Sequence, residues 1–261
     1  MFKLFNKWSH FPLLAGTVVA AAFLLHPFGI AIYHEISYAL HPSAEKAFQY
    51  GSAYFDSRAH LYDVDRAEYF YTEARRLDPN HRAVYHELAR ISFLRGSFAD
   101  ALQKIDHQIA SHGDTVPSSY YIRGLILGFM GRYDEAAAAY EKFLEYSPDN
   151  WAALNDYAWV LLKGERPREA VDVLNRGLTH FPDNPWLLNS LATAFYELGL
   201  MREAHFVALA ASKAAEGVTE QDWLTAYPGN DPRIAREGVA ALREAIERNI
   251  HIAEDSTASA R

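Results

Sequence analysis

Residues 120–150 read YYIRGLILGFMGRYDEAAAAYEKFLEYSPDN, and this stretch decides the fold. It carries a small residue at Gly124, a glycine at Gly131, an alanine at Ala136 and a proline at Pro148. Glycine readily adopts the left-handed conformation that ends a helix, and proline cannot continue a helix. The stretch therefore predicts a helix, a tight turn, a second helix and a break.

The same punctuation returns along the chain at a period of 34 or 35 residues. The repeated alanines are Ala67, Ala101, Ala136, Ala170 and Ala204. The small residues before them, where two helices are expected to touch, are Gly51, Ala89, Gly124, Ala158 and Ala192. The turn glycines are Gly96, Gly131, Gly164 and Gly199, and the closing prolines are Pro79, Pro148 and Pro182. A unit this short cannot bury its apolar face alone, so stacked helical hairpins are predicted.

This spacing resembles the tetratricopeptide repeat over residues 44–218. The five units are 44–81, 82–116, 117–150, 151–184 and 185–218. The first unit has extra residues between Gly51 and Ala67, which predict an enlarged turn. The resemblance implies an all-α fold, a right-handed α-solenoid whose concave surface binds rather than catalyses. A helix bundle or coiled coil is the alternative, and the regular Pro and Gly breaks argue against it.

Residues 11–33, FPLLAGTVVAAAFLLHPFGIAIY, contain no Lys, Arg, Asp or Glu. A helix of this length crosses a hydrocarbon core of about 30 Å, so a transmembrane signal anchor is predicted. Because Lys3 and Lys7 precede it, the positive-inside rule places residues 1–10 in the cytoplasm as a short stub. The repeats, after a linker at 34–43, are then expected in the periplasm of a bacterium with the anchor in the inner membrane. A cleaved signal peptide with secreted repeats is the alternative.

Residues 219–252 depart from the repeat pattern and predict helices that cap the array. One apolar stripe at helical spacing supports the longer of these helices: Ala235, Val239, Leu242, Ile246 and Ile250. The remaining residues, 253–261, are small and polar, and we expect a disordered tail there.

Composition excludes several functions. The net charge of -8 and the lack of a Lys/Arg-rich run argue against nucleic acid as a partner. The absence of cysteine removes disulfides and thiolate metal sites. Nucleophile elbows and phosphate-binding glycine loops are absent, and the twelve histidines lack zinc-binding spacing. We therefore expect no enzyme activity, no cofactor and no metal.

In the tetratricopeptide repeat family the first helix of each unit lines the groove, and the resemblance implies which residues face a ligand. They are His86, Arg90, Phe93, Tyr121, Phe129, Asn155, Trp159, Lys163, Trp186, Asn189, Thr193 and Tyr196. Aromatic and Arg side chains anchor interfaces, and an Asn amide can bond to a peptide backbone. The structural alternative is that the aromatics pack between neighbouring first helices.

These features together predict a membrane-anchored scaffold or adaptor. Its partner is expected to be a peptide or protein segment, belonging to a membrane or envelope complex, bound in the groove. A glycan or another nonprotein ligand in the same aromatic groove is the alternative.

Overall fold

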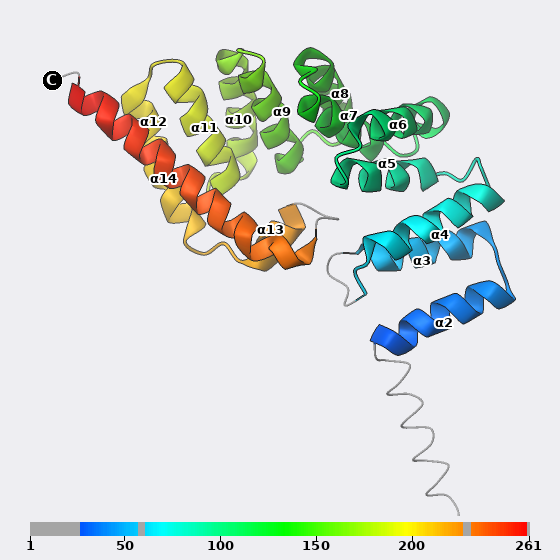
Figure 1. Ribbon diagram of the computed structural model, residues 1–261. Helices are drawn as coiled ribbons and strands as arrows, with labels where there is room; N and C mark the ends of the chain where they lie inside the picture. Colours follow the sequence, from blue (N-terminus) through cyan, green and yellow to red (C-terminus); the bar gives the residue numbers. More distant parts are fainter. Residues whose placement is uncertain (1–26, 57–60, 227–230, 260–261) are drawn as a thin grey trace, which may run out of the picture. The chain divides into compact units, whose positions relative to one another are not determined.

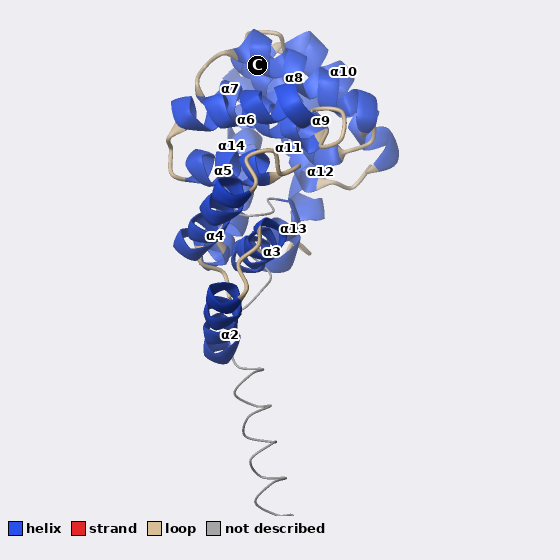
Figure 2. Ribbon diagram, turned by 90° about the vertical axis from the view of Figure 1, so that its right-hand side faces the viewer, coloured by secondary structure: helices blue, strands red, loops and turns tan. Residues whose placement is uncertain are grey.

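The computed structural model describes residues 27–56, 61–226 and 231–259. Every regular element in these ranges is helical (Figure 2). The chain divides into two compact units, one up to Pro79 and one from Asn80 onward. Each unit is described by itself, with the helix labels of Figure 1.

The five predicted repeats appear as five pairs of helices (Figure 1). They are α3 (Ala44–Phe55) with α4 (Val64–Leu77), α5 (Val84–Leu94) with α6 (Phe98–His112), α7 (Ser118–Phe129) with α8 (Tyr133–Tyr146), α9 (Trp151–Lys163) with α10 (Pro167–His180), and α11 (Pro185–Glu197) with α12 (Met201–Ala215). The helices α4, α8 and α10 each end two residues before a closing proline, as the breaks predicted.

The left-handed turn residues are Gly96, Gly131 and Gly199, with φ between 72° and 75°. Gly164 was expected to be the fourth, and this prediction is wrong. Gly164 has φ of -87°, and the next residue, Glu165, takes the left-handed conformation with φ of 60°. The position in the repeat thus decides which residue turns left-handed, even where a glycine stands next to it.

Two of the small residues leave space for an aromatic ring, and not for the backbone of the second helix. A Cβ on Gly51 would lie 2.7 Å from the ring of Tyr71, and a Cβ on Gly124 would lie 2.8 Å from the ring of Tyr140. Both tyrosine rings are fully buried. The glycine therefore lets the ring of the second helix lie flat on the first helix of the same unit.

The apolar segment 11–33 lies outside the described residues except for its end, which belongs to helix α2 (Pro27–Leu40). Among the described ranges, no helix has both the length and the apolar character needed to span a bilayer. Helix α2 also includes most of residues 34–43, the expected linker.

Helix α2 packs against the first hairpin, α3 and α4, within the unit that ends at Pro79. The ring of His34 stacks on Tyr50 with 4.1 Å between centroids. Tyr38 is buried, and its hydroxyl donates to Glu73 of α4 at 2.8 Å. Burial of these two side chains gives α2 a fixed place on the hairpin.

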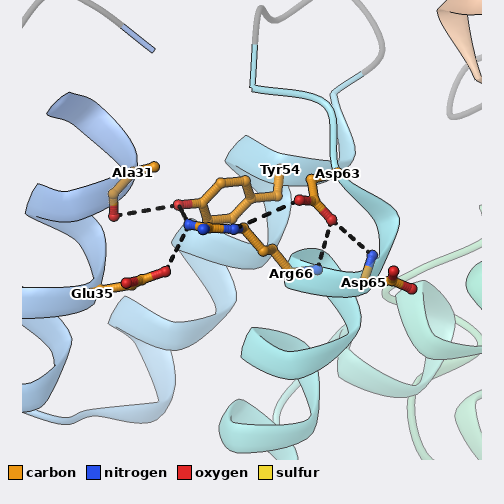
Figure 3. A network of polar contacts seen from close by, with 6 residues as sticks. All are labelled: Ala31, Glu35, Tyr54, Asp63, Asp65 and Arg66. Carbon is orange, nitrogen blue, oxygen red and sulfur yellow. Dashed lines mark hydrogen bonds and ion pairs between the residues drawn. The ribbon is translucent and has the colours of Figure 1, made fainter. Parts of the chain in front are cut away.

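Arg66 of α4 adds polar contacts to the same helix (Figure 3). Its Nη1 donates to Glu35 of α2 at 2.6 Å and to the hydroxyl of Tyr54 at 3.4 Å. Asp63 caps α4 by accepting from the backbone N–H groups of Asp65 and Arg66. The side chains of Arg66 and Glu35 are 42% and 54% exposed, so their ion pair contributes at most about 1 kcal/mol.

The second unit ends in α13 (Glu220–Ala226), a 3-10 turn at Pro232–Ile234 and α14 (Ala235–Ser259). The predicted apolar stripe of α14 is confirmed, because its residues pack in a cluster with Trp186 and Trp223. Helix α14 packs on α12 and on α11 (Figure 1), and it continues to Ser259, into the segment expected to be a disordered tail.

Candidate functional site

The second unit curves so that its first helices lie on the inner side. Consecutive first helices, α5, α7, α9 and α11, pack directly on one another, whereas consecutive second helices lie further apart. A stack whose members are closest along one edge bends toward that edge. We call the surface of α5, α7, α9 and α11 on this side the inner face.

Hydrogen bonds connect neighbouring first helices across the inner face. The hydroxyl of Tyr121 on α7 donates to Oδ2 of Asp156 on α9 at 2.6 Å. Oδ1 of Asn155 on α9 accepts from the hydroxyl of Ser190 on α11 at 2.8 Å. Both bonds join residues 35 positions apart, so they repeat with the period of the units.

Helix α14 continues this series in place of a sixth first helix. The amide of Asn249 donates to Oδ1 of Asn189 at 2.9 Å and to the hydroxyl of Thr193 at 3.1 Å. Asn189 and Thr193 were predicted to face a ligand. Their side chains instead contact the C-terminal helix of the same chain.

Asp156 is the functional candidate that the sequence did not single out. It stands next to Asn155, whose Nδ2 lies 3.4 Å from its Oδ1. Burial raises the pKa of Asp156 to about 6, although the hydrogen bonds from Tyr121 and Asn155 act in the opposite direction. The repeat register is the sequence signal for this residue. Asp156 occupies the same place in its unit as Ile122 and Ser190 do in the neighbouring units, and it is the one charged residue of the three.

An aromatic cluster lies at the C-terminal ends of the first helices. Phe129 packs on Phe93 at 5.2 Å and on Trp159 at 5.4 Å between centroids, and Phe98 of α6 joins them. Phe129 is 56% exposed, and Trp159 and Phe93 are half-buried. Three predicted ligand-facing residues therefore form one partly exposed aromatic surface.

Gly128 explains how Trp159 reaches this cluster. A Cβ on Gly128 would lie 2.6 Å from the indole ring of Trp159. Because glycine leaves this space open, the indole of α9 lies across α7 and contacts Phe129.

Two charged candidates and one further aromatic candidate remain. Arg90 pairs with Glu87 of its own helix at 2.7 Å. Lys163 is exposed, and its charge lowers the pKa of Glu197, which burial raises more strongly. Tyr196 is also exposed.

Two predicted ligand-facing residues are buried instead. His86 is only 6% exposed, with Nδ1 at 3.0 Å from the hydroxyl of Ser119 and its backbone N–H donating to Gln108. Trp186 packs on Trp151 at 5.3 Å, within the cluster beneath α14. Both side chains hold neighbouring helices together, so neither offers its surface to a ligand.

Burial lowers the pKa of His86 from 6.5 to about 4. The folded state therefore holds His86 neutral while the unfolded chain binds a proton below pH 6.5. The contribution of neutral His86 to stability is complete above pH 6.5 and is lost as the pH falls toward 4.

The described residues contain no group of His, Asp and Glu arranged to hold a metal ion. The inner face combines hydrogen-bonding side chains, one carboxylate and an aromatic surface. This chemistry suits reversible binding of a ligand.

Comparison with known proteins agrees with this geometry. Residues 123–185 match the sequence model of the tetratricopeptide repeat family. This match spans most of the third unit and all of the fourth. A search of the curated proteins found no match.

Solved structures share the fold at low sequence identity. The crystal structure of MamA protein has a TM-score of 0.57 and 17% identity, and the match covers 66% of this chain and 92% of that chain. MamA of MSR-1 has a TM-score of 0.56 and 18% identity, covering 71% and 96%. YrrB, described as a TPR protein with an unusual peptide-binding site, has a TM-score of 0.56 and 13% identity, covering 69% and 91%.

Proposed function

We propose that this tetratricopeptide repeat protein is a membrane-anchored scaffold that binds an extended peptide or protein segment on its inner face. The observation that carries the proposal is the pairing of Asn155 with Trp159, one helical turn apart on α9. Trp159 offers a half-buried aromatic surface. Asn155 uses one amide N–H toward Asp156 and keeps the second for a peptide carbonyl.

A bound segment gains from both kinds of contact. Aromatic surfaces such as that of Phe129 and Trp159 supply anchoring contact area. Side-chain amides satisfy the backbone groups of an extended chain, which would otherwise lose hydrogen bonds to water. The description of YrrB as having a peptide-binding site supports this proposal through the shared fold.

We extend the proposal to the membrane because residues 11–33 contain no charged side chain. They would cross a bacterial inner membrane, with residues 1–10 in the cytoplasm and the repeats in the periplasm. The partner would then belong to a membrane or envelope complex. Cleavage as a signal peptide is the competing outcome, and it leaves the repeats in the same compartment.

The binding proposal is tested by photo-crosslinking in intact cells. Replacing Phe129 with p-benzoylphenylalanine puts the reactive group on the inner face, and the same replacement at Phe206 of α12 is the control. Phe206 is 74% exposed, so both positions are accessible aromatics. We expect protein adducts at Phe129 that are lost when Asn155→Ala and Trp159→Ala are added.

Adducts of equal intensity at both positions would contradict a specific inner face. Adducts that are removed by glycosidases and resist proteases would favour the glycan alternative. Sidedness is tested separately by adding protease to spheroplasts. Digestion of the repeats before lysis supports the proposed orientation, digestion only after lysis contradicts it, and a released soluble fragment indicates cleavage.

A further inference from the structure

Asp156 is a carboxylate on the inner face that has no cationic partner among the residues that the structure describes. Other carboxylates of this unit pair with arginine, as Glu135 does with Arg132 and Glu169 does with Arg166, both at 2.7 Å. Asp156 meets two neutral donors instead. No Lys, Arg or His in the described ranges lies within ion-pair distance of it.

The neighbouring helices do not supply the missing charge. On α7, Arg123 is engaged in an ion pair with an aspartate of α6 at 2.8 Å. On α9, Lys163 lies two turns further along and interacts with Glu197. On α8, the hydroxyl of Tyr140 is buried and has no hydrogen-bond partner. Within the described part of the chain, no cation compensates the charge of Asp156.

The fold does not need this charge. Asparagine has the same shape, and its Oδ1 would accept the hydrogen bond from Tyr121 without the cost of burying an ion, at the loss of only the long 3.4 Å contact with Asn155. Residues that break a local rule without a local gain are expected at functional sites. Asp156 is half-buried as a residue, and its two hydrogen bonds are only partly buried, so a ligand on the inner face can approach it.

The surroundings of Asp156 suit a cation. Tyr121 lies at one carboxylate oxygen, and Trp159 follows Asp156 by three residues, on the same side of α9. A carboxylate accepts about four hydrogen bonds, and Asp156 receives two. Aromatic rings attract ammonium and guanidinium groups through their faces.

We propose that Asp156 forms the base of a subsite for a basic side chain, Lys or Arg, of the segment bound on the inner face. This inference rests on the proposed function and names the chemistry of its ligand. The cation donates to the unused lone pairs of Asp156, its stem lies along Trp159, and the second amide N–H of Asn155 receives a backbone carbonyl beside it.

The test uses the full-length chain in detergent micelles and fluorescein-labelled peptides of about ten residues selected from a randomised library. Each selected peptide is remade with Arg as citrulline or Lys as norleucine, which removes the charge and keeps most of the shape. We expect the neutral peptide to bind the native chain at least about tenfold more weakly. With Asp156→Asn, the charged and neutral peptides should bind equally.

Asp134→Asn is the matched control, because it changes the net charge by the same amount. Its side chain is 93% exposed, lies on α8 and pairs with Arg166 at 3.5 Å. This variant should keep the full preference for the charged peptide. The subsite is refuted when Asp156→Asn keeps the preference, or when the selected peptides lack basic residues. Selection of no peptide at all would refute the proposed function itself.

Discussion

Glu165 holds the same left-handed backbone conformation as Gly131, 34 residues earlier, with φ of 60° and 75° respectively. Both residues close the first helix of their unit through equivalent bonds, since Gly131 N donates to Gly128 O and Glu165 N donates to Leu162 O. The left-handed conformation costs an L-residue roughly 1–2 kcal/mol that glycine does not lose. The fourth unit therefore carries strain that the third unit avoids.

Replacing Glu165 with Gly should stabilise the protein. We expect a net gain of roughly 0.5 to 1 kcal/mol, because relief of strain exceeds the extra entropy that glycine gives the unfolded chain. The free energy of unfolding from urea titration measures it. The reciprocal change, Gly131→Ala, should cost about 1 kcal/mol, since its Cβ meets no atom within 4 Å and only the backbone opposes it. No gain for the glycine variant would mean that Glu165 is unstrained.

Gly124→Ala should destabilise the protein by about 2 kcal/mol. The added Cβ would lie 2.8 Å from the ring of Tyr140, and this fully buried ring has no free space to move into. Gly217→Ala is the control, because a Cβ there meets nothing within 4 Å. Thermal unfolding of both variants compares the two positions, and an equal change in Tm would show that the ring does not fill the space beside Gly124.

Tyr140→Phe should leave stability unchanged or raise it by up to about 1 kcal/mol. The hydroxyl of Tyr140 is buried and has no hydrogen-bond partner among the described residues, so its removal eliminates the free-energy cost of burying an unpaired polar group. Urea titration at neutral pH measures the change. A loss larger than about 1 kcal/mol would reveal a partner for the hydroxyl, such as a bound water.

Asp156→Asn should raise stability at neutral pH and lose this advantage in acid. The pKa of Asp156 is raised from 3.8 to about 6, so the folded state binds its proton more readily than the unfolded chain does. Protonation of Asp156 therefore raises the free energy of unfolding of the native chain as the pH falls from about 6 to 3.8. The Asn variant has no such group, so its free energy of unfolding lacks this contribution. The difference is up to about 3 kcal/mol at pH 7 and approaches zero near pH 4.

Urea titrations of both proteins at pH 7, 6, 5 and 4 measure this difference. Other titrating groups, including His86, are common to both proteins and cancel in the comparison. A difference that stays constant with pH would mean that Asp156 does not titrate in this range.

Packing, rather than the exposed ion pair, should hold α2 on its hairpin. Tyr38→Ala removes a buried ring and the hydrogen bond to Glu73, and it should raise amide hydrogen exchange across α2 by about 30-fold or more. Arg66→Gln removes the ion pair with Glu35 and should raise exchange less than about fivefold. A larger increase in exchange for Arg66→Gln than for Tyr38→Ala would show that the ion pair of Arg66 holds α2 on the hairpin.

The repeat units could be predicted from the sequence because their breaks obey a period. All five helix pairs follow from the alanine register and the Pro and Gly positions. The prediction for Gly164 is wrong because position in the repeat, and not residue type, selects the left-handed residue. The sequence pattern assigns one part of α2 to an apolar span and the other part to a linker. It does not predict a single packed helix, because the packing of α2 depends on contacts with Tyr50 and Glu73 of other helices.

The candidate site was predicted less completely, for a related physical reason. The register tells which side of a helix a residue occupies, and by it Asn155, Trp159 and Phe129 remain predicted ligand contacts. It does not tell how deeply a neighbouring unit covers that side. His86 and Trp186 are covered by other helices. Asp156 becomes a candidate only through its hydrogen bond with the hydroxyl of Tyr121, which lies 35 residues away in the sequence.

The position of α14 limits how this chain can assemble with copies of itself. Repeat arrays could grow end to end if the last hairpin packed against the first helix of another copy, and such open contacts produce filaments. Here α14 already occupies that place on α11 and α12 and bonds to Asn189 through Asn249. The chain therefore finishes its own array at the C-terminal end, and each copy offers a fixed number of first helices to a ligand.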